Sequence, residues 1–164
     1  MFPVKRLSLI LAIASGVIVP GTMLHADLRV DGKGFVTLQL GEEKWEDYPG
    51  IPGIKRMTVY GNPSKPGPYV IRVRFSPGTM SMPHYHPEDR IVTVLKGTWW
   101  TGKGPEFSPG NTEAIRPGGY MMHPAKEAHF DGAKDEEVIL QIAGMGPSGT
   151  HFINADLGAT GSSR

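Results

Sequence analysis

The sequence predicts an all-β protein whose strands form one antiparallel barrel or double sheet of the jelly-roll kind. Short apolar stretches alternate with a period of two residues, as strands with one buried face do. The 22 glycines and 15 prolines recur between these stretches, where tight turns need them. Few windows carry a helical period, so roughly eight strands remain to build a single domain.

The first 26 residues are predicted to form an export signal. Lys5 and Arg6 form a short basic start, residues 7–19 are almost wholly apolar, and the small residue Ala26 ends the segment. The apolar run is shorter than the roughly 20 residues that span a bilayer. We therefore expect cleavage near Ala26 and a periplasmic or secreted protein, with an uncleaved anchor as the alternative.

The mature chain is predicted to comprise one domain at residues 27–150 and a flexible tail at residues 151–164. Removing Lys5 and Arg6 leaves 15 basic residues against 16 acidic ones, so the formal charge moves from +1 to −1. Such a balance argues against nucleic acid as a partner, and no membrane contact is expected of the mature form. Cysteine is absent, so a metal site would use nitrogen and oxygen ligands, with methionine sulfur the only soft choice.

The expected strands follow one another at short intervals. An alternating segment at Gly34–Leu40 predicts a half-buried first strand. Two long loops are expected at residues 61–68 and 103–118, which are dense in glycine, proline and small polar residues. The further strands are expected at Met57–Tyr60, Tyr69–Phe75, Ile91–Leu95 with Thr98–Thr101 around Gly97, Tyr120–His123, Ala128–Gly132 and Val138–Ala143.

Three histidines form the most informative pattern. His84 and His86 are separated by one residue, so on a strand both imidazoles leave the same face. His129 opens another predicted strand, which antiparallel closure could bring opposite the first two. Three imidazoles that leave coordination positions open are what a catalytic metal ion needs.

The spacing of these residues resembles the two motifs of the cupin superfamily. The first motif is matched by Gly78, His84, His86 and Gly97, and the second by Gly118, Pro124 and His129. The resemblance covers roughly residues 69–143. It implies a cupin-type jelly-roll antiparallel β-barrel with one divalent metal ion.

Three positions depart from those motifs. Arg90 stands where the family has an acidic ligand, Lys126 replaces a glycine and Ala133 an asparagine. A guanidinium cannot ligate a cation, which excludes a site of three histidines and a glutamate unless Glu88 or Glu127 swings in. What remains resembles the three-histidine cupins, several of which are iron-dependent oxygenases. Fe(II) is therefore favoured, with Zn, Mn, Ni or Cu as alternatives.

Arg90 and His123 are the candidate catalytic residues. Arg90 could hold an anionic substrate group beside the metal ion, or it could pair with Glu88, Asp89 or Glu127 at the barrel rim. His123 could be a fourth ligand or a proton shuttle, or a hydrogen-bonded core or rim residue.

Three functions remain open at this point. The first is an oxygenase that cleaves a small aromatic, diketone or related acid. The second is a periplasmic cupin that binds a metal ion or ligand without catalysis, and the third is a metal-dependent isomerase or lyase. A homodimer is also possible, because the adjacent Trp99 and Trp100 point to opposite faces of a strand.

Overall fold

The computed structural model describes residues 28–162. The predicted export signal, residues 1–26, lies outside this range. The described chain is built of strands, with one short 3-10 helix, η1, at Ala155–Leu157. Among these residues no helix is long and apolar enough to cross a bilayer.

The first large sheet has six antiparallel strands in the order β11-β8-β13-β5-β4-β3. Its centre is the pairing of β5 with β13 over nine residues, from Phe75 opposite Val138 to Gly67 opposite Gly146. Both strands are rich in β-branched residues, which pack well on a pleated surface. The bounds are β3 Glu46–Asp47, β4 Ile54–Tyr60, β5 Gly67–Phe75, β8 Arg90–Lys96, β11 Tyr120–His123 and β13 Val138–Gly146.

The second sheet has seven strands, with β10-β9-β12-β6-β15 in order and β7 joining β12 to β14. Its strands are shorter, and all four residues of β12 are buried. The bounds are β6 Thr79–Ser81, β7 His84–Tyr85, β9 Trp99–Lys103, β10 Glu113–Ile115, β12 His129–Gly132, β14 His151–Phe152 and β15 Thr160–Ser162.

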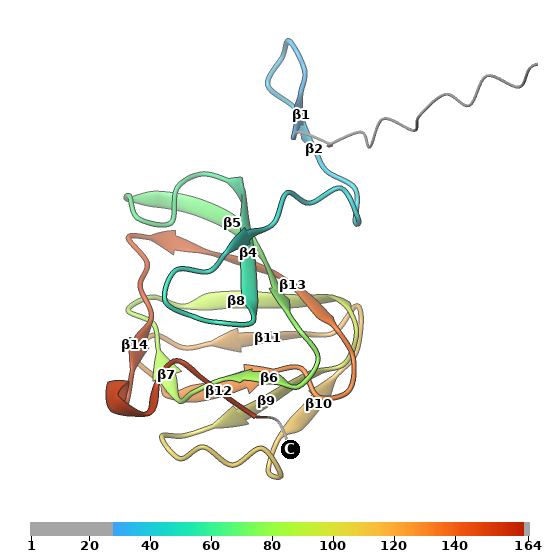
Figure 1. Ribbon diagram of the computed structural model, residues 1–164. Helices are drawn as coiled ribbons and strands as arrows, with labels where there is room; N and C mark the ends of the chain where they lie inside the picture. Colours follow the sequence, from blue (N-terminus) through green and yellow to red (C-terminus); the bar gives the residue numbers. More distant parts are fainter. Residues whose placement is uncertain (1–27, 163–164) are drawn as a thin grey trace, which may run out of the picture.

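Figure 1 shows the strands of the two large sheets, and most residues of the main hydrophobic core belong to strands of the first sheet. Inward residues of β8 alternate with exposed ones, so Val92 and Val94 are buried whereas Ile91 is half exposed. Every strand pairing is antiparallel, which confirms the predicted all-β jelly roll. The core residues are Ile51, Ile54, Tyr69, Ile71, Val73, Phe75, Val92, Val94, Trp99, Ala133, Val138, Leu140 and Ile142.

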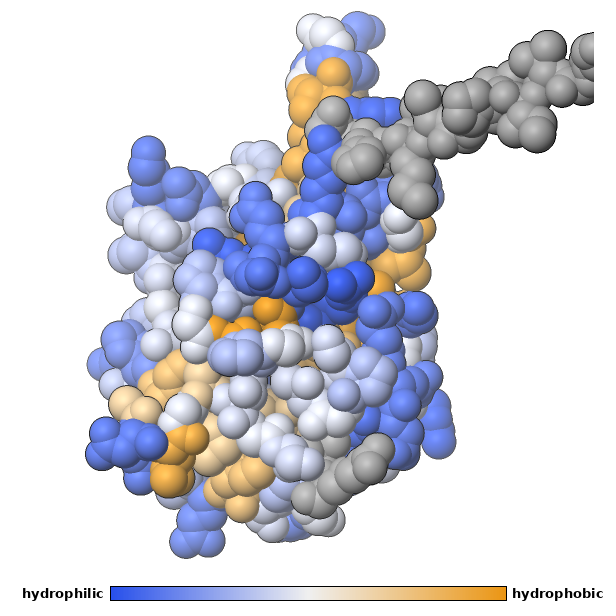
Figure 2. Space-filling view, in the orientation of Figure 1, coloured by the Kyte–Doolittle hydropathy of each residue, from blue (hydrophilic) through white to orange (hydrophobic). Residues whose placement is uncertain are grey.

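The predicted half-buried strand at residues 34–40 is wrong. Only Val36–Thr37 forms a strand there, β2, which pairs with β1 at Arg29–Val30 in a separate two-stranded sheet. Figure 2 shows apolar residues on this hairpin, which projects from the body, and Phe35 is 69% exposed. The alternating pattern is present, but within residues 28–162 no other sheet covers its apolar side.

Two other segments are more regular than the sequence predicts. The expected loop at 103–118 contains β10, which pairs with β9 from Glu113 to Ile115. The expected tail from 151 onward is contradicted as far as 162, because β14 pairs with β7 and β15 pairs with β6. These strands form on available sheet edges, so they depend on distant partners more than on local apolar pattern.

Candidate metal centre

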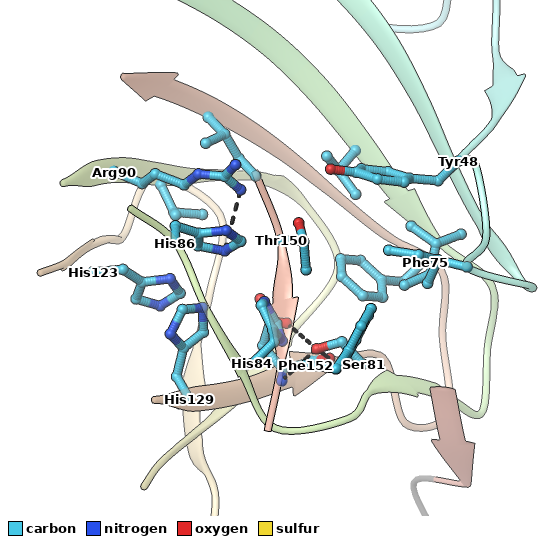
Figure 3. Close-up of a pocket in the computed structure, with 16 residues that line it drawn as sticks. Tyr48, Phe75, Ser81, His84, His86, Arg90, His123, His129, Thr150 and Phe152 are labelled. Atoms are coloured by element: carbon cyan, nitrogen blue, oxygen red, sulfur yellow. Dashed lines mark hydrogen bonds between the residues drawn. The ribbon is translucent and has the colours of Figure 1, made fainter. Parts of the chain in front are cut away.

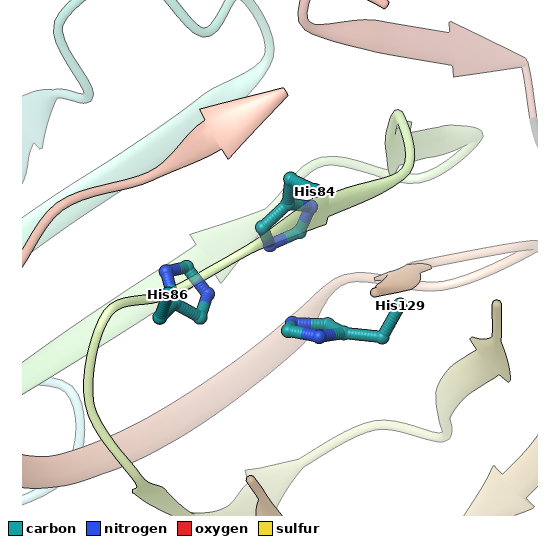
Figure 4. Close-up of side chains that lie close together, drawn as sticks. All are labelled: His84, His86 and His129. Carbon is teal, nitrogen blue, oxygen red and sulfur yellow. The ribbon is translucent and has the colours of Figure 1, made fainter. Parts of the chain in front are cut away.

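His84, His86 and His129 converge inside the barrel (Figure 4). His84 begins β7 and stands directly opposite His129, the first residue of β12, while His86 lies one residue beyond β7. The centre of the His84 ring lies 4.8 Å from that of His86 and 4.4 Å from that of His129. One ligand atom from each of the three residues lies within 4.8 Å of the others, and all three residues are buried. The group could therefore hold a metal ion.

Backbone carbonyls fix how each imidazole is protonated. The Nδ1 atom of His84 lies 2.8 Å from the oxygen of Met82, and that of His86 lies 2.7 Å from the oxygen of Gly149. His129 Nδ1 lies 3.0 Å from its own carbonyl partner, Glu127. A carbonyl oxygen only accepts, so each Nδ1 carries the proton and each Nε2 carries a lone pair that can accept a hydrogen bond or bind a metal ion. Hydrogen bonds of this kind orient imidazole ligands toward a metal ion.

Burial keeps the three rings neutral near pH 7. It lowers the pKa of His84 to about 4, with a contribution from the nearby His129. The pKa of His129 is lowered by burial as well, and that of His86 is lowered by burial and by the guanidinium of Arg90. A metal ion needs neutral imidazoles, so no proton has to be removed at neutral pH before binding.

An unpaired nitrogen supports the fit to a metal ion. His129 Nε2 is buried and has no hydrogen-bond partner among the described residues. Such a group costs free energy unless something binds it, since burial removes its water. A divalent cation that accepts nitrogen ligands would satisfy it, so the donor set fits the ion that the sequence predicts.

Arg90 lies inside the pocket and next to the histidines. Its Nη1 donates to His86 Nε2 at 3.2 Å, and its Nε donates to Glu88 Oε1 at 3.0 Å. Nη2 donates to the hydroxyl of Ser148. Arg90 therefore pairs with Glu88 and also lines the pocket. Arg90 engages the lone pair of His86 that a metal ion would use, so metal binding requires this hydrogen bond to break.

His123 lies beside the three histidines and outside the group of candidate ligands. As the cross-strand neighbour of Arg90, it packs its ring 3.7 Å from that of His129, measured between centroids. Its Nε2 is buried without a hydrogen-bond partner. Burial, reinforced by His129, lowers the pKa of His123 to about 3. His123 is therefore a neutral, unpaired imidazole at the wall of the pocket.

Asp131 is a buried acidic residue that the sequence analysis missed. Its Oδ1 accepts a hydrogen bond from Ser81 Oγ at 2.6 Å and its Oδ2 accepts one from Trp99 Nε1 at 3.1 Å. Burial would raise its pKa, but His84, His129 and His123 hold the pKa below its usual range. Both oxygens are engaged, so Asp131 places a negative charge behind the imidazoles. Its position two residues after His129 was the signal that could have found it.

The pocket around these groups is small and half apolar (Figure 3). Its free volume is about 40 Å³, enough for an ion and a few water-sized groups. The four histidines, Ser81, Arg90, Asp131 and Thr150 form its polar walls. The apolar walls come from Ile51, Ile54, Val73, Phe75, Val92, Ile142 and Phe152, and Phe152 belongs to the segment predicted as a tail.

The second motif keeps its geometry despite the missing glycine. Lys126 has a φ of 67°, the left-handed conformation that glycine adopts most easily. Its N–H donates to the carbonyl of His86 at 2.7 Å, which ties the turn before His129 to the turn after His84. The substitution of glycine by lysine therefore leaves the two halves of the site connected.

Comparison with known families settles the class of the chain. The family described as the ChrR cupin-like domain matches residues 33–148, which is most of the sequence. The chain belongs to this cupin-like family. No curated protein sequence matches it significantly.

Solved structures agree on the fold. The polyketide cyclase RemF from Streptomyces resistomycificus superposes with a TM-score of 0.59 at 18% identity, over 72% of this chain and 84% of that one. A cupin-2 domain protein, Rru_A2000 from Rhodospirillum rubrum, has a TM-score of 0.53 at 16% identity, over 68% and 72%. The DMSP lyase DddQ from Ruegeria pomeroyi DSS-3 has a TM-score of 0.52 at 16% identity, over 63% and 56%. At these identities the likeness concerns the fold alone.

Proposed function

We propose that this cupin is a metal-dependent enzyme that acts on a small organic anion, with His84, His86 and His129 as the ligands. The observation that carries the proposal is the convergence of three buried, neutral and oriented imidazoles in one pocket. When bound, a divalent ion supplies a Lewis acid with open coordination positions. Fe(II) remains our favoured metal.

The charges near the pocket favour an anionic substrate. Arg90 contributes one positive charge, and its partner Glu88 and the buried Asp131 contribute two negative charges. A divalent cation would bring this sum to +1, which one carboxylate neutralises. Arg90 would then bind that group, since a guanidinium and a carboxylate form paired hydrogen bonds.

His123 has a narrower role in this proposal than the sequence suggests. With a pKa of about 3 it is a weak base, so it is poorly suited to remove a proton at neutral pH. Its unpaired Nε2 is better suited to a hydrogen bond with a substrate hydroxyl or carbonyl. We propose that His123 orients the substrate.

For the reaction we propose oxygen-dependent cleavage of a small aromatic, diketone or related acid, as in the three-histidine cupins. A metal-dependent lyase or isomerase is the second candidate. It is favoured by the presence of a polyketide cyclase and a DMSP lyase among proteins of similar fold.

Oxygen consumption separates these candidates. The full chain would be loaded with Fe(II), Mn or Zn and incubated with a panel of small acids and diketones. Oxygen uptake that His86→Ala abolishes supports the oxygenase. Product formation without oxygen uptake supports the lyase or isomerase, and a bound metal ion without any turnover supports a non-catalytic binding protein.

We also propose export to the periplasm or the exterior, which N-terminal sequencing of the purified mature protein would test.

A further inference from the structure

A second cavity adjoins the metal pocket. It has a free volume of about 290 Å³, several times that of the metal pocket. The two cavities share the side chains of Tyr48, Ile51, Arg90, Thr150 and Phe152 as walls. In Figure 3, Arg90 and Tyr48 lie on the side of the pocket away from His84 and His129. We call this second cavity the outer chamber.

The charged side chains that line the outer chamber are Arg56 and Arg90. Arg56 lies in β4, and its guanidinium is 5.1 Å from the centre of the Tyr48 ring. Within residues 28–162 it forms no ion pair, not even with its cross-strand neighbour Glu46. No acidic side chain lines the chamber, so the positive charge of Arg56 is uncompensated there.

Arg90 has hydrogen-bonding capacity to spare. A guanidinium carries five N–H groups. The contacts to Glu88, His86 and Ser148 use three of them, one on each nitrogen. Two N–H groups remain, and Arg90 lines the outer chamber as well as the metal pocket.

We infer that the outer chamber binds the carboxylate of a small organic acid between Arg56 and Arg90. This inference deepens the proposed function. Its relevance to catalysis rests on that function, because the bound acid would be the substrate. The uncompensated charge of Arg56 matches one carboxylate, and Arg90 supplies two free donors. The apolar walls, which include Pro49, Pro63 and Ile71, suit the uncharged part of the acid. The free volume of the metal pocket admits only the reacting end of such a ligand.

The test uses the full chain without added metal, so that it does not depend on the metal centre. Benzoate, hexanoate and pyruvate would each be titrated by calorimetry beside their neutral amides. We expect saturable binding of at least one acid and about tenfold weaker binding of its amide, since a charged hydrogen-bonded pair is lost.

Two variants localise the site. Arg56→Gln should weaken binding of the acid about tenfold. Lys55→Gln removes the same charge from the neighbouring residue, which pairs with Asp47 and does not line the chamber, and should change little. Equal effects of the two variants, equal binding of acid and amide, or no binding of any acid at 10 mM would overturn the inference. Metal titration of the same preparations reports on the proposed function separately.

Discussion

The two large sheets share one interior but contribute different chemistry to it. Aliphatic residues predominate on the inner face of the first sheet, the aliphatic wall. The second sheet, the polar wall, presents polar groups from short strands beside the buried Met80, Trp99 and Phe130. The first contributes Ile71, Val73, Val92, Val94, Leu140 and Ile142, and the second contributes Ser81, His84, Thr101, His129 and Asp131. None of the three proposed ligands comes from the first sheet, although Arg90 and His123 do, so stability and metal binding depend largely on different residues. Substitutions should therefore separate the two properties.

The largest expected effect is on the aliphatic wall. Leu140 is fully buried in β13, so Leu140→Ala should lower the free energy of unfolding by about 2–5 kcal/mol. Urea unfolding would measure this. The matched variant Ile91→Ala removes an apolar side chain that is 52% exposed and should cost about 0.5 kcal/mol or less. A Leu140→Ala protein that stays folded should bind metal as tightly as the parent, and a large loss of affinity would break the separation of the two walls.

On the polar wall the effect should be on metal affinity. His84→Ala removes one of the three proposed ligands and should weaken metal binding at least about a hundredfold. Even the loss of a group that only hydrogen-bonds to a ligand lowers metal affinity about 10- to 100-fold. Competition with a fluorescent chelator would measure the affinity. The free energy of unfolding of the metal-free protein should fall far less than in Leu140→Ala. Unchanged affinity would remove His84 from the ligand set.

Acid should destabilise the metal-free protein through His123, a buried residue of β11 in the first sheet. The pKa of His123 is about 3 in the folded protein, well below its value near 6.5 in an unfolded chain. Below pH 6.5 the unfolded chain therefore binds more protons than the folded protein. The contribution of His123 to the free energy of unfolding is present above pH 6.5 and is lost as the pH falls. Between pH 7 and pH 5 this one residue should contribute a loss of about 2 kcal/mol.

The variant His123→Phe isolates that contribution. It keeps a ring of similar size and removes the titrating group, so the unfolding free energy should fall less steeply with acid than in the parent. Urea unfolding of both metal-free proteins at pH 7 and pH 5 would measure the two slopes. Identical slopes would show that His123 does not stay neutral in the folded protein.

A smaller effect is expected at the contact between the two walls. Arg90, from the first sheet, donates a hydrogen bond to His86 and competes there with a metal ion. Arg90→Met combined with Glu88→Gln removes this donor without leaving a buried carboxylate unpaired. Metal affinity should rise about tenfold relative to Glu88→Gln alone, since one hydrogen bond and a nearby positive charge are lost. An unchanged or lower affinity would show that Arg90 does not compete.

The sequence predicts the long strands and the shared face of His84 and His86 for a local reason, whereas His129 lies on a distant strand and is predicted from the motif resemblance. Two-residue alternation and the spacing of His84 and His86 depend only on neighbouring residues. The hairpin at 29–37 and the strands after 150 depend on whether a distant sheet edge is free, which alternation does not report. The same holds for Ser148 and Gly149, which reach Arg90 and His86 from a loop far along the chain. Asp131 could have been found, since it shares a face with His129.

We propose that the imidazoles of His84, His86 and His129 together bind one metal ion. X-ray absorption spectroscopy of the protein titrated with zinc tests it most directly. We predict one equivalent of zinc with three imidazole nitrogens at about 2.0–2.1 Å. His129→Ala should reduce the number of imidazole ligands, whereas His123→Phe should leave the spectrum unchanged. A stoichiometry near zero, or a spectrum that changes with His123 and not with His129, would contradict the claim.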